Sequence, residues 1–290
     1  MAVSSEKIPA PLTFRAASPE AAAAASLAAL EETMERVGPD RVLALVMEPI
    51  GGQSSGVNVP HPSFASGARA ICDRHGIRLV FDESVCAFRT GSFLAAHHAP
   101  GALPDVAVLA KGLVAGYAPL GAALMPAQLV EDVVATTGFT VSHSYDANPI
   151  ACAAGAAVLD EIIERDLIAH AATVGGHLRA GLEAIAERSL LIGDVRGRGL
   201  LLAIELVADR AALARFPAEV DPGVVALRHG LDHGLLLYSR RQNSGRYGDW
   251  LLVAPPLVIE EADCDDLLAR LEATLADTAE ELLTRRVAAV

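Results

Sequence analysis

Lysine is nearly absent from this chain of 290 residues, which contains Lys7 and Lys111 beside 21 arginines. Positive charge is also outnumbered by negative charge. The formal net charge of −13 argues against a nucleic-acid or anionic-membrane partner, because both bind a basic surface. Aromatic residues are few, at 4%, but apolar residues reach 52%. This composition is typical of a globular protein and excludes a disordered chain.

Long apolar runs are missing too. No stretch reaches the ~18 consecutive apolar residues of a membrane span, and Pro9 and Pro11 stand where a signal peptide would have its apolar core. Cysteine is scarce: the four residues are scattered and form no CxxC pair. We therefore expect reduced thiols and a cytoplasmic protein.

The mid-chain lysine is the first candidate for chemistry. Lys111 follows the apolar run 106–110, in a chain that otherwise uses arginine for positive charge. Arginine keeps its proton and forms no imine, whereas a partly desolvated lysine can lose its proton and form one. Composition alone leaves a second interpretation equally open, in which the amine of Lys111 simply reaches solvent from a strand end.

In the first half of the chain, short apolar runs alternate with helical patterns. The runs predict buried strands near 42–47, 78–81, 106–110 and 121–125, and the patterns predict helices over 18–37 and 63–75. This alternation predicts an α/β fold with a mostly parallel sheet. Ligands of such sheets bind at the carboxyl ends of the strands, where Asp82 and Lys111 both lie.

The pattern changes near residue 165. Before this point the sequence predicts a helix over 149–165. After it, the sequence predicts helices over 167–188, 222–233 and 260–283 and strands near 191–195, 200–206, 235 and 251. We therefore expect a domain boundary here, with residues 1–165 in a large domain and residues 166–290 in a smaller one.

The pair Asp82 and Lys111 suits pyridoxal 5'-phosphate (PLP). That cofactor needs a lysine to hold its aldehyde as a Schiff base and an acid to keep its pyridine nitrogen protonated. Spacing alone does not separate this from a helix cap or salt bridge made by Asp82 and Glu83.

An ordered set of sequence segments is more specific evidence than the pair Asp82 and Lys111. The set comprises Gly38–Val42, Glu48–Gly52, Ile71–Ile77, Val80–Glu83 with Phe88–Gly91, Pro104–Asp105, Ala110–Leu113, Pro119–Ala122, Asn148–Ala154, Gly193–Leu200 and Gly248–Leu257. Over nearly the whole chain it resembles the class III, or ω-amino-acid, type of PLP-dependent aminotransferases. The resemblance implies the type I PLP-enzyme fold, like that of aspartate aminotransferase. Helices would cover both faces of the sheet, residues 1–165 would be part of the PLP-binding domain, and a small α+β domain would follow.

Site residues follow from the same resemblance. It implies that Lys111 is the Schiff-base and proton-transfer lysine and that Asp82 is the partner of the pyridine nitrogen. Ser84 stands where the family usually has a ring-packing valine, and we expect Ser84 and Val85 beside the cofactor. Ser144, in place of the usual threonine, would contact the cofactor phosphate of a neighbouring subunit.

Two departures concern the substrate. The usual glycine after Phe88 is missing, a shortening shared with aminomutases that act on glutamate semialdehyde. The arginine that binds an α-carboxylate is absent from 251–254. Amine and ω-amino-acid transaminases often use an upstream arginine instead, and Arg246 matches it best, with Arg240 and Arg241 as rivals. An ordinary surface role is nevertheless the better explanation for any one of the three.

Metal binding is not expected. His229 and His233 have the i, i+4 spacing of metal ligands, but the residues between them lack the glutamate of a zincin. We expect all nine histidines to be structural or exposed to solvent.

Full-length members of the family carry a further N-terminal third, with the turn that binds the PLP phosphate and an aromatic residue on the ring. The resemblance therefore implies either a truncated product or one half of a split enzyme. Of these we expect the C-terminal subunit of a split aminotransferase, with a second polypeptide supplying that third in an α₂β₂ heterotetramer. It would transfer an amino group from an amine or ω-amino acid to a 2-oxo acid. A PLP-dependent aminomutase or racemase, and a non-catalytic half that stabilises a paralogous partner, are the alternatives.

Overall fold

The computed structural model describes residues 4–138 and 142–288, with side chains to residue 282. It divides into two compact units. The first contains the chain up to Ile50, Pro60–Phe88 and Phe93–Asp166; the second contains Gly51–Val59, Arg89–Ser92 and the chain from Leu167 onward. Two short segments from the first half of the sequence therefore belong to the second unit.

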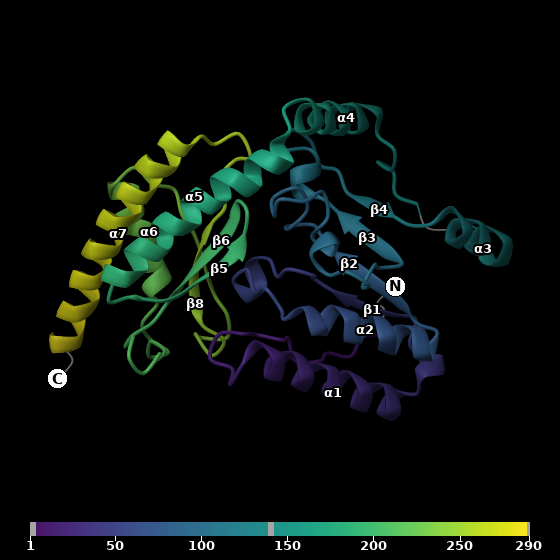
Figure 1. Ribbon diagram of the computed structural model, residues 1–290, viewed down its shortest axis with the longest axis horizontal. Helices are drawn as coiled ribbons and strands as arrows, with labels where there is room; N and C mark the ends of the chain where they lie inside the picture. Colours follow the sequence, from purple (N-terminus) through teal and green to yellow (C-terminus); the bar gives the residue numbers. More distant parts are fainter. Residues whose placement is uncertain (1–3, 139–141, 289–290) are drawn as a thin grey trace. The chain divides into compact units, whose positions relative to one another are not determined.

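The first unit is built on a four-stranded sheet in the order β1-β2-β3-β4 (Figure 1). Its strands are β1 (Ala44–Met47), β2 (Arg78–Asp82), β3 (Val106–Leu109) and β4 (Ala122–Leu124). The first three are parallel, and β4 runs antiparallel to β3 at the edge. The mostly parallel α/β sheet expected from the sequence is confirmed.

Two helices pack with this sheet. Helix α1 (Pro19–Val37) begins at Ser18, whose hydroxyl accepts the N–H of Ala21 at 3.1 Å. Helix α2 (Pro62–His75) ends at Gly76, whose φ of 65° suits glycine. One core joins both helices to the buried side chains of β2, which include the fully buried Leu79 and Phe81.

The first unit also contains further helices and helical turns. It contains η1 (Pro39–Arg41), η3 (Ala95–His98), η4 (Lys111–Leu113), α3 (Ala127–Thr137) and α4 (Pro149–Glu164). The sequence did not predict α3. Pro126 precedes it and makes no side-chain capping bond, and none of its residues is buried. A helix with neither a cap nor a buried face gives little signal in a sequence.

The second unit is built on an antiparallel sheet in the order β5-β6-β8-β7, and its described residues include three α-helices. Its elements are η2 (Gln53–Ser55), α5 (Leu167–Arg188), β5 (Ile192–Arg198), β6 (Leu201–Leu206), α6 (Pro222–Asp232), β7 (Tyr238–Arg241), β8 (Asp249–Val253) and α7 (Glu261–Ala288). The strand expected near Leu235 begins instead at Tyr238. It is the edge strand, where a polar sequence is tolerated because one side has no strand partner.

Loop 51–59 is bonded to this sheet. The carbonyl of Gln53 accepts the indole N–H of Trp250 at 2.9 Å, and the carbonyl of Gly56 accepts Nε of Arg196 at 2.5 Å. Gly56 has φ 61°, and a Cβ there would lie 2.6 Å from the Trp250 ring. Arg196 also meets the buried Glu205 at 2.7 Å. The loop is therefore part of the packed second unit.

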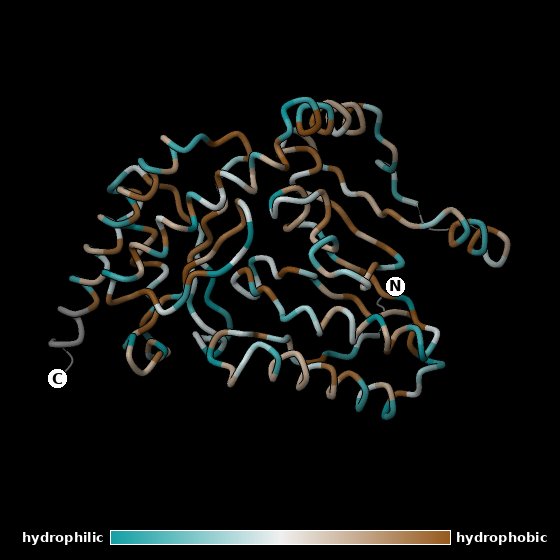
Figure 2. The backbone as a smooth tube through the Cα atoms, viewed as in Figure 1, coloured by the Kyte–Doolittle hydropathy of each residue, from teal (hydrophilic) through white to brown (hydrophobic). Residues whose placement is uncertain are grey.

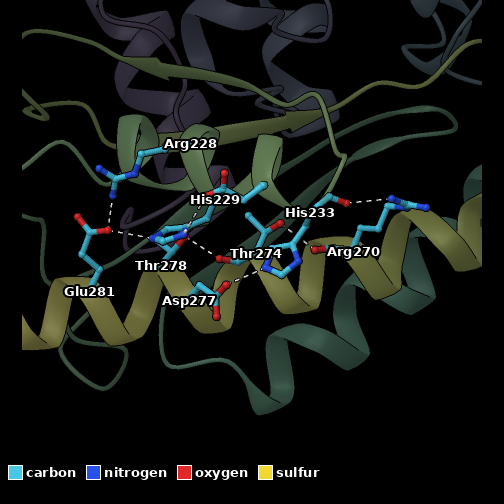
Figure 3. A network of polar contacts seen from close by, with 9 residues as sticks. Arg228, His229, His233, Arg270, Thr274, Asp277, Thr278 and Glu281 are labelled. Atoms are coloured by element: carbon cyan, nitrogen blue, oxygen red, sulfur yellow. Dashed lines mark hydrogen bonds and ion pairs between the residues drawn. The ribbon is translucent and has the colours of Figure 1, made fainter.

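Two histidine–carboxylate pairs join α7 to His229 of α6 and to His233, the residue directly after α6 (Figure 3). Nε2 of His229 lies 2.9 Å from Oε2 of Glu281, and Nε2 of His233 lies 2.7 Å from Oδ2 of Asp277. Arg270 donates to the His233 carbonyl at 2.9 Å. Both i, i+4 histidines therefore connect helices. Among the described residues, no group of three His, Cys, Asp or Glu side chains is arranged to hold a metal ion. No described helix is both long and apolar enough to cross a membrane.

Candidate active site

The site is built on two neighbouring parallel strands. Asp82 is the last residue of β2 and lies opposite Val108 of β3 in the strand register. Lys111 follows three residues after Val108, at the start of η4. The two side chains predicted to anchor the cofactor therefore leave the sheet at the same carboxyl edge, as strand order had indicated.

Lys111 has an unusual backbone conformation. Its φ is 46°, in the left-handed region, which costs a residue with a Cβ about 1–2 kcal/mol. The preceding Leu109 and the following Leu113 are buried, but Lys111 itself is exposed. The partial desolvation considered from the sequence is therefore not seen. Strained backbone of this kind is concentrated at functional sites.

Packing holds the backbone next to Lys111 on two sides. A Cβ added to Gly112 would lie 3.4 Å from the ring of Phe88. A Cβ added to Gly155 of α4 would lie 2.8 Å from Leu120 and 3.5 Å from Val114. The segment that carries Lys111 is thus held between the loop after β2 and helix α4.

The carboxylate of Asp82 has a local partner. Its Oδ1 accepts the main-chain N–H of Ser84 at 3.0 Å, within the turn that follows β2. Ser84 and Val85 are half-buried in that turn. The bond fixes the orientation of the carboxylate, a feature of turns that begin with aspartate.

The sequence missed the role of the next residue, Glu83. It is fully buried, and its carboxylate accepts the N–H groups of Ala95 at 2.5 Å and Ala96 at 2.8 Å. Burial raises the pKa of the Glu83 carboxyl, although these two N–H groups and the Cys86 thiol act in the opposite direction. Side chains alternate along a strand. A cofactor-facing role for Asp82 could therefore have indicated that Glu83 lies on the other, buried face, where Leu79 and Phe81 also lie.

Ser144 lies away from the two strands in the sequence, in a turn just before α4. It is exposed. Nearby in the sequence, the Asp146 carboxylate accepts the N–H of His143, and the side-chain oxygen of Asn148 accepts the N–H of Ile150. The segment 139–141 before Ser144 lies outside the described residues. The contact of Ser144 with a neighbouring subunit remains a prediction.

The three candidate arginines belong to the second unit. Arg240 and Arg246 are exposed. Arg241 is instead engaged inside the unit, with Nε 3.4 Å from Asp249 and a second nitrogen 2.9 Å from the Pro217 carbonyl. Of the three, Arg240 and Arg246 have the more accessible guanidinium groups for a substrate carboxylate.

Residues 1–275 match the family described as aminotransferase class III. The chain belongs to the class III aminotransferases. It is 33% identical over 251 residues to the uncharacterized aminotransferase YodT of Bacillus subtilis, which covers 85% of this chain and 56% of that protein. It is 32% identical over 249 residues to a taurine–pyruvate aminotransferase of Bilophila wadsworthia, covering 84% and 54%.

Solved structures of transaminases share the fold. An amine transaminase from an uncultivated Pseudomonas species, in its PLP-bound form, superposes with a TM-score of 0.83 at 32% identity, over 93% of this chain and 61% of that chain. The type I PLP-enzyme fold is therefore confirmed for this class III chain. It spans little more than half the length of the two curated relatives.

The family and the PLP-bound neighbour point to pyridoxal 5'-phosphate as the cofactor. The residues at the β2–β3 edge fit this group chemically. Lys111 offers an exposed primary amine for the aldehyde, and Asp82 offers a carboxylate whose orientation is fixed by Ser84.

Proposed function

We propose that Lys111 and Asp82 are the cofactor-anchoring residues of a PLP-dependent transaminase to which this chain contributes. The observation that carries the proposal is the register of β2 and β3, which brings both residues to one sheet edge. Asp82 and Lys111 are also the residue types that the pyridine nitrogen and the aldehyde of PLP require.

Each residue has a defined task. When bound, PLP supplies an electron sink that stabilises negative charge on the substrate carbon. The Asp82 carboxylate would hold the proton on the pyridine nitrogen, and the Ser84 N–H keeps Oδ1 in place for this. Nζ of Lys111 would hold the cofactor, then accept a proton from the substrate carbon and return it.

The proposed reaction transfers an amino group from an amine or ω-amino acid to a 2-oxo acid. Two comparisons support this substrate class. One relative is named for taurine, which carries its amine at the end opposite its acid, and for pyruvate, a 2-oxo acid. One solved neighbour is an amine transaminase.

Covalent trapping tests the proposal sharply, because the chain has only two lysines. PLP is added to the chain together with a polypeptide that carries the N-terminal third expected from the family resemblance, the mixture is reduced with borohydride, and peptides are mapped by mass. We expect a pyridoxyl group on Lys111, and the same label in a Lys7→Arg control. A label on Lys7, or full activity in Lys111→Arg, would reject the assignment.

We further propose that a second polypeptide completes the fold. The relatives are nearly twice as long as the matched region, and the first unit exposes apolar side chains that such a partner would cover. Among them are Val133 at 39% and Val134 at 53% on α3, and Ile150 at 79% on α4. Figure 2 shows hydrophobic residues along α3. A soluble protein rarely leaves such a surface uncovered.

This partner would supply the N-terminal third of the fold and pair again into an α₂β₂ heterotetramer. An interface of that kind is obligate in size, above ~2,000 Å². Light scattering should show the larger assembly only when both polypeptides are present. The double variant Val133→Glu, Val134→Glu should weaken it without unfolding the chain, because neither side chain is buried. A lone chain that is monomeric, binds PLP and converts an amine with pyruvate would contradict the proposal.

A further inference from the structure

A buried carboxylate closes the loop that follows β2. Glu83 is 0% exposed. Its Oε2 accepts the N–H of Ala95 at 2.5 Å, its Oε1 accepts the N–H of Ala96 at 2.8 Å, and the Cys86 thiol lies 3.6 Å from Oε2. The Glu83 side chain thus joins the start of the loop to Ala95 and Ala96, where the loop ends twelve residues later.

The main chain of Glu83 reaches the neighbouring strand. Its N–H donates to the carbonyl of Val108 at 2.9 Å, which continues the pairing of β2 with β3 one residue beyond Asp82. Val108 precedes Lys111 by three residues. Glu83 is therefore bonded directly to the strand that delivers the lysine.

The same loop contacts the lysine segment from another side. Phe88 has a left-handed φ of 68°, and its N–H donates to the Phe93 carbonyl at 3.1 Å. The two rings meet edge to face with centroids 6.2 Å apart. The Phe88 ring lies 3.4 Å from the position that a Cβ would take on Gly112. The closed loop therefore packs against the backbone next to Lys111.

We infer that Glu83 is a positioning residue that sets the placement of Lys111 relative to Asp82. The inference rests on the proposed function, because the placement of Lys111 matters for catalysis only if Lys111 and Asp82 hold the cofactor. The contacts of Glu83 are observed independently of that function. Burying a carboxylate is costly, and an apolar side chain would fill the space without that cost. The carboxylate offers two oxygens to two N–H donors, an arrangement that glutamine cannot reproduce because one of its two ends is a donor.

The test compares three variants of the full chain. Glu83→Gln keeps the size but loses one of the two accepted N–H bonds. Phe88→Leu keeps the carboxylate but removes the ring against Gly112, so it tests the contact through which the loop closed by Glu83 would act on the lysine segment. If Glu83→Gln does not fold, unchanged exchange and dichroism in Phe88→Leu reject the inference. Asp105→Asn is the matched control. Its carboxylate accepts the N–H of Leu79 at the opposite end of β2 and β3, so it destabilises the same strands without touching the loop.

The first readout is hydrogen exchange of the chain without cofactor. Loss of a bond in a buried network should speed exchange of peptides covering 108–116 by about tenfold in Glu83→Gln. Asp105→Asn should speed hydrogen exchange of these peptides less than Glu83→Gln does, when the two variants are compared at the same loss of unfolding free energy. The second readout is the visible circular dichroism of the unreduced complex, which reports cofactor orientation. It is divided by the amount of PLP that borohydride then traps on Lys111 in the same sample. It should fall in Glu83→Gln and Phe88→Leu but not in Asp105→Asn.

The two proposals can fail separately. Wild-type chain that takes no label on Lys111 rejects the proposed function, and exchange alone then decides whether Glu83 positions the lysine segment. Labelled wild type, with exchange of 108–116 and dichroism unchanged in Glu83→Gln and Phe88→Leu, rejects the role of Glu83. Faster exchange confined to 83–97 rejects it as well.

Discussion

Asp82 lies opposite Val108 in the parallel register of β2 and β3. This single relationship fixes the geometry of the site, because Lys111 follows Val108 by three residues and begins η4. The acid and the amine come from different strands, so their separation depends on strand pairing. A change that shifts the pairing should affect both at once.

Replacing Asp82 by asparagine should slow transamination by about 10²-fold or more. The amide still accepts the Ser84 N–H, so the turn is preserved, but a neutral group cannot hold the pyridine nitrogen protonated. The measurement is the rate of the amine half-reaction in the completed assembly, with bound PLP quantified by absorbance. Asp73→Asn, which alters an exposed carboxylate of α2, should leave the rate unchanged. Near wild-type turnover of Asp82→Asn would mean that another residue faces the nitrogen.

Asp105 should contribute stability that acid removes. Partial burial acts to raise the pKa of its carboxyl, but the N–H of Leu79 at 2.7 Å and the guanidinium of Arg69 at 2.8 Å outweigh it and lower that pKa. A lowered folded-state pKa gives stability that is complete above the unfolded pKa and is lost as pH falls through the folded value.

Asp105→Asn should therefore lose about 1.5–3 kcal/mol of unfolding free energy at pH 7, the usual worth of hydrogen bonds to a charged group. The difference from wild type should shrink below the ordinary aspartate pKa of 3.8. Urea unfolding at pH 7 and pH 3 measures both. A difference that is equal at the two pH values would show that the charge of Asp105 is not the cause.

Two adjacent glycines of α5 should respond in opposite directions to alanine. A Cβ on Gly175 would lie 2.2 Å from the main-chain carbon of Gly199, which cannot move aside easily, whereas a Cβ on Gly176 would meet nothing within 4 Å. We expect Gly175→Ala to cost about 1–3 kcal/mol through overpacking. Gly176→Ala should gain about 0.5–1 kcal/mol from helix propensity. Thermal unfolding of both variants decides this, and a stabilised Gly175→Ala would show that α5 and the β5–β6 turn are less closely packed.

The contact between His233 and Asp277 should contribute little. Their side chains are 32% and 47% exposed, so solvent screens the pair. A double-mutant cycle with alanine at each position should give a coupling of about 0.2–1 kcal/mol. The coupling should weaken in 1 M salt, where the Debye length falls to about 3 Å. A coupling that salt does not change would indicate a hydrogen bond without a charge component.

Local signals in the sequence predicted much of this fold. Ser18 before Pro19 marked the start of α1, and Gly76 marked the end of α2, because both residues act through their own backbone or side chain. The apolar runs located the strands of the first sheet. Since parallel strands present their carboxyl ends at one edge, the placement of Asp82 and Lys111 followed from strand order.

Features set by tertiary contacts could not be predicted in this way. The partners of Glu83 are main-chain N–H groups twelve and thirteen residues later, and any residue carries such a group. Helix α3 buries none of its side chains, so no periodic pattern was selected for packing within this chain. The strand β7 was predicted too early, because the apolar run 235–237 lies just before it, whereas β7 itself is an edge strand with a polar sequence.

The packing of loop 51–59 onto the second sheet has a consequence for synthesis. Gln53 and Gly56 leave the ribosome long before Arg196 and Trp250, to which they are bonded in the folded chain. The second unit can therefore be completed only after residue 250 has emerged. Contacts over such sequence distances slow folding and prolong exposure of apolar strands. A fragment starting at Leu167 would lack the loop that covers Trp250, so it should aggregate when translated alone.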